Sequence, residues 1–117
     1  MLNQVVLVGR LTKEPEVKEL ESGQKVSNIT LAVPRSYKNP DGIYETDFID
    51  CTLWNDVASN TFQYCQKGDT IGIKGILQTD QYEKDGKKFS KLNLIGERVT
   101  FLNNRYKEEK LATVEAR

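Results

Sequence analysis

Two aromatic residues stand on the polar face of a strand-like segment, residues 46–55. Side chains alternate between the two faces of a strand, and one parity here is mostly apolar, with Ile49 and Leu53, so it is predicted to face a core. Phe48 and Trp54 belong to the other parity, among threonine and aspartate. A large ring is not needed for folding on such a face, whereas every nucleic-acid base has a π-face on which a ring can stack. This segment alone leaves two readings open: the rings stack unpaired bases, or a helix or partner subunit covers them.

Residue types that usually carry catalysis are scarce in this chain. None of the 117 residues is histidine, which removes the commonest general base and most zinc sites. Cys51 and Cys65 do not have the spacing of metal ligands, and Cys51 reads as a small core residue. Asp47, Asp50 and Asp56 could suggest a metal-dependent nuclease, but Asp47 and Asp50 have opposite strand parity and Asp56 stands where a helix begins. We therefore expect no enzymatic activity, no cofactor and no metal.

The charge balance limits how the chain could bind a polyanion. Its 17 basic and 17 acidic side chains give a net charge of zero. Any affinity for nucleic acid must then come from local charge placement together with stacking. The length suits one domain, and the sequence has neither a signal peptide nor an apolar run of about 18 residues. The expected location is the cytoplasm, with no membrane association.

The surrounding sequence predicts an all-β domain with one helix. Alternation and turn residues predict strands at residues 3–11, 25–37, 45–54, 69–78 and 89–102, and a helix at 56–67. Turns are indicated at residues 39–42 (NPDG) and at Asp85-Gly86. Three strands, one helix and two strands is the order of a five-stranded OB-fold barrel with its helix between strands three and four. That fold binds oligonucleotides and oligosaccharides.

Local details follow from residue type. Gly9 is expected to mark a bulge or a close backbone approach, and Pro34 a bulge or an edge. Asn55 or Asp56 is expected to cap the helix. The residues at helical spacing, expected to form its buried face, are Val57, Thr61, Phe62 and Cys65.

Several segments together resemble the bacterial-type single-stranded DNA-binding proteins (SSB). They read LNQVVLVGRLTKEPEV, VSNITLAVPRSY, ETDFIDCTLWNDVA, YCQKGDTIGIKGILQT and VTFL, in order over residues 1–102. The resemblance implies an OB-fold and sequence-nonspecific binding of single-stranded DNA in replication, recombination and repair. It also implies a homotetramer, with a dimer as the other assembly considered. The family's base-stacking aromatics carry over to Tyr37, Phe48, Trp54 and Tyr82.

Basic residues near this surface are candidates for phosphate contacts. Arg35 and Lys91 are favoured, because their strand parity matches that of Tyr37 and Phe89 respectively. Whether Phe89 extends the stacking surface or packs under the hairpin stays open. The candidates in full are Arg10, Lys18, Arg35, Lys38, Lys74, Lys84, Lys87, Lys88 and Lys91, with Lys13 nearby.

The chain departs from the family pattern in two places. Asp80 and Gln81 stand where the family usually has a basic residue shortly before the hairpin aromatic, so one phosphate contact is in doubt. Residues 103–117 read as a charged, disordered tail, without the acidic tip through which relatives recruit replication and recombination proteins. We expect a cut or short form, such as a phage- or plasmid-encoded one. The rival reading is an OB-fold protein-interaction module, a primosome-like accessory factor with weak DNA binding; a cold-shock-like RNA-binding role is less favoured.

Overall fold

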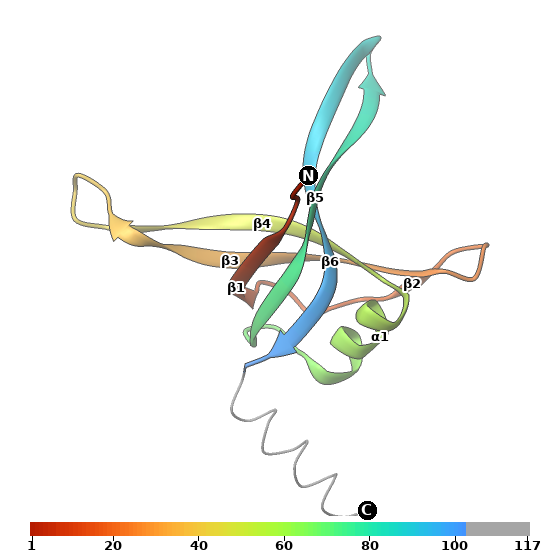
Figure 1. Ribbon diagram of the computed structural model, residues 1–117, viewed down its shortest axis with the longest axis horizontal. Coiled ribbons are helices and arrows are strands. Elements are labelled where there is room, and N and C mark those ends of the chain that lie inside the picture. The colour runs from red at the N-terminus through yellow and green to blue at the C-terminus, as the bar shows by residue number, and fades with distance from the viewer. Residues whose placement is uncertain (103–117) are drawn as a thin grey trace, which may run out of the picture.

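Six strands and one helix follow one another along residues 1–102, the part of the chain that the computed structural model describes (Figure 1). The predicted tail at residues 103–117 lies outside the described residues. The elements are β1 (Val5–Leu11), β2 (Lys18–Glu19), β3 (Lys25–Lys38), β4 (Tyr44–Trp54), α1 (Asn55–Tyr64), β5 (Thr70–Lys84) and β6 (Lys87–Phe101).

Five of these strands close into a barrel. Neighbouring strands run in the order β1-β5-β6-β4-β3, and β3 pairs back with β1. Only the β4–β6 contact is parallel, with Cys51 opposite Leu94, and the other pairings are antiparallel. This confirms the predicted OB-fold, with its helix between the third and fourth barrel strands. The short β2, which pairs with the start of β3, was not predicted because two residues show no periodicity.

The barrel interior is filled by the apolar parity of each strand. Ile29, Leu31, Leu53 and Ile71 are among the residues that are fully buried. Where β5 and β6 approach closely only glycine fits: a β-carbon on Gly75 would collide with the backbone carbonyl of Ile95. The predicted close approach at Gly9 is confirmed as well, since a β-carbon there would lie 2.9 Å from the Ala32 carbonyl oxygen.

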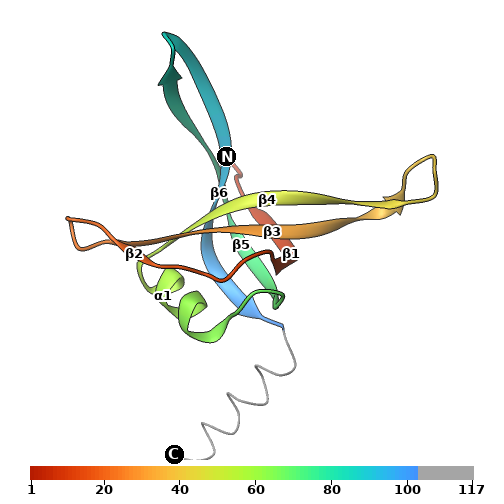
Figure 2. The same ribbon diagram turned by 180° about the vertical axis from the view of Figure 1, so that it is seen from behind.

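Two long hairpins extend from the barrel, one formed by β3 and β4 and the other by β5 and β6 (Figures 1 and 2). The second was predicted too short, because β5 runs six residues past residue 78 to Lys84 and β6 starts at Lys87 rather than 89. Its outer part is exposed on both faces and therefore lacks the alternation that marks a half-buried strand. Asp85 and Gly86 form the predicted turn, with φ angles of 52° and 75°. In the first hairpin the register shifts between Pro34 and Lys38, which confirms the irregularity expected at Pro34.

The helix is shorter than predicted, ending at Tyr64 rather than residue 67. The predicted cap is wrong: Trp54 occupies the N-cap without a side-chain cap, and the Asn55 Oδ1 instead accepts a hydrogen bond from the Lys25 backbone N–H at 3.1 Å. Phe62 was wrongly assigned to the buried face, since it is 56% exposed. The buried residues of the helix are Ala58 and the predicted Thr61. Within residues 1–102 no helix has the length and apolar character needed to cross a bilayer.

Candidate nucleic-acid interface

Phe48 and Trp54 share one exposed face of the sheet, as their parity predicts. The register pairs Ala32 with Phe48 and Val26 with Trp54, and the residues between them on this face of β4 are polar. Phe48 is 67% exposed and Trp54 is 37% exposed. Hence no helix of the described chain covers these rings. We call this side of β3 and β4, together with the side of the β5–β6 hairpin that meets it, the outer face.

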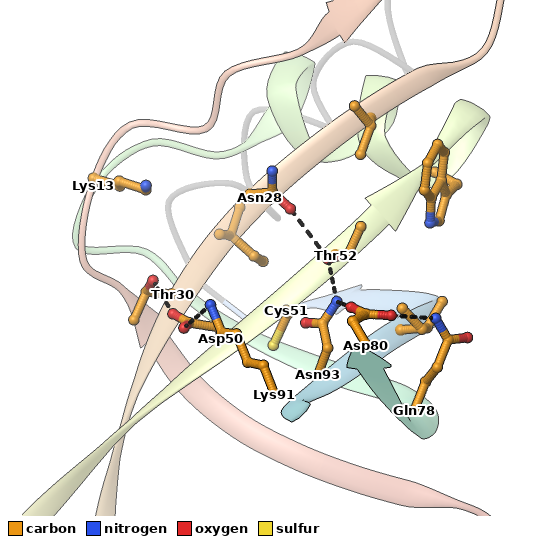
Figure 3. Close-up of a pocket in the computed structure, with 14 residues that line it drawn as sticks. Lys13, Asn28, Thr30, Asp50, Cys51, Thr52, Gln78, Asp80, Lys91 and Asn93 are labelled. Carbon is orange, nitrogen blue, oxygen red and sulfur yellow. Dashed lines mark hydrogen bonds and ion pairs between the residues drawn. The ribbon is translucent and has the colours of Figure 1, made fainter. Parts of the chain in front are cut away.

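A groove of about 590 Å³ lies at the centre of the outer face, between β3–β4 and the base of the β5–β6 hairpin (Figure 3). Trp54 lines it, and its floor is a chain of hydrogen-bonded polar side chains. Thr52 Oγ1 donates to Asn28 Oδ1 at 3.1 Å, and Asn93 Nδ2 donates to Thr52 Oγ1 at 2.7 Å. Asn93 Nδ2 also lies 3.4 Å from Asp80 Oδ2. These bonds link four strands and hold the floor of this central groove in one arrangement.

An ion pair occupies another part of the same groove. Asp50 Oδ1 accepts a hydrogen bond from Thr30 Oγ1 at 2.8 Å, and Lys91 Nζ lies 3.2 Å from Asp50 Oδ2 (Figure 3). The Thr30 hydrogen bond, followed by that from Lys91, lowers the pKa of the Asp50 carboxyl. Lys13 lines the groove too. The structure therefore brings the favoured candidate Lys91 to the site, with its ammonium already paired.

Tyr82 and Phe89 form a stacked pair on the β5–β6 hairpin. They are directly opposite each other in the register, and their ring centroids are 5.4 Å apart at an interplanar angle of 20°. Both rings are about half exposed. Tyr82 has the strand parity of Asp80, which hydrogen-bonds in the groove, so the pair lies on the same face further out along the hairpin. Phe89 packs against the Tyr82 ring in this pair, and whether its own ring also stacks a base stays a prediction.

Arg35 is directed away from this face. Its Nε and Nη2 donate to the two carboxylate oxygens of Asp47, each at 3.0 Å, and its Nη1 donates to Glu45 at 2.7 Å. Asp47 has the parity opposite to that of Phe48, so the structure does not bring the Arg35 guanidinium together with the two rings. The hydrogen bond with Asp47 raises the pKa of Arg35 and lowers that of Asp47. Tyr37 lies within the register shift of β3, between Pro34 and Lys38, is exposed, and does not line the central groove.

The remaining basic candidates are spread over several surfaces. Lys84 and Lys87 pair at the end of the hairpin with the parity of Tyr82, whereas Lys88 pairs with Glu83 on the opposite face. Lys38 sits 5.6 Å from the centroid of the Tyr44 ring. The others lie on β1, β2 and β5 and do not line the central groove: Arg10, Lys18 and Lys74.

Comparison with known proteins agrees with the barrel fold. The model of the Single-strand binding protein family matches residues 2–102. The chain belongs to this family. It is 43% identical over 110 residues to single-stranded DNA-binding protein B of Bacillus subtilis, covering 93% of this chain and 97% of that protein. It is also 43% identical over 106 residues to the single-stranded DNA-binding protein of Bacillus cereus, covering 90% of this chain and 62% of that one.

A solved member of the single-strand binding family has the same fold. A crystal structure of a deletion mutant of the single-stranded DNA binding protein from Thermus aquaticus superposes with a TM-score of 0.74 at 28% identity, covering 89% of this chain and 52% of that one. The chain thus spans nearly the whole Bacillus subtilis relative but only about half of the Thermus aquaticus chain.

Sequence analysis did not predict the polar floor of the groove. Alternation alone would have placed Asn28 and Thr52 on the outer parity. The contribution of Asn93 depends on the β5–β6 register, which no local pattern specifies. Tertiary closure of the barrel is what brings it to Thr52.

Proposed function

We propose that this chain binds single-stranded DNA, without requiring a particular sequence, by stacking bases on the rings of its outer face. The observation that carries the proposal is the exposure of Phe48 and Trp54 on one face of β4, together with Tyr82 on the hairpin face that meets Trp54 at the central groove. Phe48 lines a neighbouring hollow with Leu77 and Leu92. Exposed rings of this kind add little to folding but offer sequence-tolerant platforms for bases. Tyr37 continues the path along the β3–β4 hairpin in this proposal.

Stacking has to supply most of the affinity in this neutral chain. Each base stacked on a ring contributes about 1–3 kcal/mol by alanine substitution. Basic side chains of the outer face, Lys91, Lys84 and Lys87, contact phosphates between the stacked bases. The contacts are few, so the affinity falls less steeply with salt than for a strongly basic protein.

The test is a titration with oligo-dT that follows the emission of Trp54, the only tryptophan in the chain. A base stacked on the indole should quench its emission strongly at low salt. Unchanged emission, together with unretarded oligonucleotide in a gel-shift assay, would remove the proposed site.

The biological role we infer is protective and non-catalytic. The protein coats exposed single strands in the cytoplasm during replication, recombination and repair, and prevents their re-annealing and nuclease attack. The alternative of a protein-interaction module with weak DNA binding is not favoured, because the relatives are named as single-stranded DNA-binding proteins. Micromolar or weaker affinity for DNA beside tight binding to a protein partner would reverse this preference.

We also propose that the chain assembles into a homotetramer. Apolar side chains of β1 support this, since Val6 and Val8 are exposed in the single chain. Burying such residues is the usual driving force for subunit association. Light scattering should give the mass of four chains; a dimer would favour the protein-interaction module, and a monomer would refute assembly.

A further inference from the structure

One carboxylate in the central groove has no cationic partner. Lys91 is the cross-strand neighbour of Asp80, but its ammonium lies 3.2 Å from Asp50 instead. Among residues 1–102 no ammonium or guanidinium group is within ion-pair distance of Asp80. The nearest polar partners of Asp80 are neutral amides, so its negative charge faces the groove uncompensated.

Two amide groups hold this carboxylate in place but leave part of it unused. Gln78 Nε2 donates to Asp80 Oδ1 at 2.9 Å, and Asn93 Nδ2 lies 3.4 Å from Asp80 Oδ2 (Figure 3). An ionised carboxylate has about four acceptor positions, so about two of them remain available. It carries no hydrogen to donate. Asp80 therefore offers a fixed group that only accepts hydrogen bonds.

The groove has room for a nucleobase beside this acceptor. The groove has a volume of about 590 Å³, and both the Trp54 ring and the polar floor that includes Asp80 line it. A base stacked near the ring directs its polar edge along the groove, where hydrogen-bonding groups can distinguish one base from another. A lysine or arginine at position 80 would contact phosphate in any sequence, whereas a carboxylate can be satisfied only by a donor.

We propose that Asp80 biases base choice in this groove toward bases that carry an exocyclic amino group. The inference rests on the proposed function, since it assigns a preference to the same DNA-binding site. Cytosine presents its N4 amino group to a carboxylate, a pairing also known from readout of base edges in duplex DNA. Thymine places a carbonyl oxygen at the same position, where it meets the carboxylate oxygen without a hydrogen between them. Its N3–H is flanked by two carbonyl oxygens and so gives a poorer match.

The experiment compares oligo-dC with oligo-dT of equal length, at mildly alkaline pH where cytosine is unprotonated, using the Trp54 emission. The measured quantity is the ratio of the two dissociation constants, Kd for dT over Kd for dC. Asp80→Asn should lower this ratio about fivefold, because the amide can donate to the thymine carbonyl. Melting temperatures of the variants establish that the fold is retained.

Asp85→Asn is the matched control. It removes the same charge from the same hairpin, at a turn position with a φ of 52° that asparagine tolerates. It should leave the ratio unchanged. If Asp80→Asn tightens dC and dT equally, the carboxylate only repels phosphate and the base preference is refuted. If the unmodified protein binds neither oligomer, the proposed function itself fails.

Discussion

Replacing Phe48 with alanine separates the cost to DNA binding from the cost to folding. The ring is 67% exposed, so about a third of its surface is buried in the free chain. For a side chain of about 200 Å² this is about 65 Å² of apolar contact, or at most about 1.5 kcal/mol of stability. The β-carbon that alanine keeps reduces the expected loss to about 1 kcal/mol, which corresponds to roughly 4–8 °C in Tm.

The same substitution should weaken DNA binding much more. Losing one stacked base costs about 1–3 kcal/mol, which is a rise in Kd of roughly 5- to 150-fold. Phe48→Ala retains Trp54, so the quenching titration with oligo-dT can be used unchanged. The comparison is between two free energies measured on this one variant: the change in binding free energy and the change in the free energy of unfolding.

Two further variants calibrate the result. Phe62→Ala removes a ring of similar exposure, 56%, from the helix, so it should leave Kd nearly unchanged while lowering Tm at least as much as Phe48→Ala. Leu53→Ala removes a side chain with no exposed surface and should cost about 2–5 kcal/mol of stability. The reasoning is refuted if Phe48→Ala destabilises the fold as Leu53→Ala does, or if its Kd is no higher than that of Phe62→Ala.

Other outcomes follow from the positions of charged and buried groups. Lys87→Ala should make the slope of log K against log salt shallower by about 0.7, whereas Lys88→Ala on the opposite hairpin face should leave it nearly unchanged. The lowered pKa of Asp50 means that its hydrogen bond from Thr30 and its ion pair with Lys91 stabilise the fold above the ordinary carboxyl pKa of about 3.9. This contribution is lost as pH falls through the lower folded value. Urea unfolding of the parent and Asp50→Asn chains should therefore differ at neutral pH and converge below about pH 4; a constant difference would contradict this. Burial raises the pKa of the Cys51 thiol to about 12, so iodoacetamide should label it only after unfolding, as followed by mass spectrometry.

Those parts of the fold that depend on local alternation could be predicted from the sequence. Residues 46–55 show period-two patterning because one face of β4 lines the barrel, and this pattern alone identified Leu53 as buried and Phe48 as exposed. The turn at Asp85 and Gly86 could be predicted for a similar reason, since few residues adopt positive φ at both positions. In the helix, by contrast, the apolar spacing included Phe62 and omitted Ala58, because which side of the helix meets the barrel depends on tertiary packing.

Strand alternation could not predict which charged side chains form ion pairs. Lys91 was expected to be available for phosphate, yet barrel closure brings Asp50 of β4 to it, 41 residues away in the chain. Arg35 was expected on the same strand face as Tyr37. A register shift of β3 between Pro34 and Lys38 breaks this alternation, and the guanidinium of Arg35 binds Asp47 instead. In both cases the partner is set by strand register, which depends on the whole sheet rather than on the segment.

The paired charges change how electrostatics can act in this site. A phosphate that approaches Lys91 has to compete with Asp50, so part of its attraction is offset by the ion pair that it weakens. Arg35 is held by two carboxylates in the same way. Exposed ion pairs of this kind contribute little to folding, typically about 0–1 kcal/mol. Fold stability therefore does not explain why acidic residues stand beside these cations. Their larger effect is on binding, where they limit the part of the affinity that depends on charge. The rings carry no such competitor, since Phe48 and Trp54 have exposed faces in the free chain. With Lys91 already paired, DNA binding by this neutral chain should depend on stacking more than it would in a basic relative.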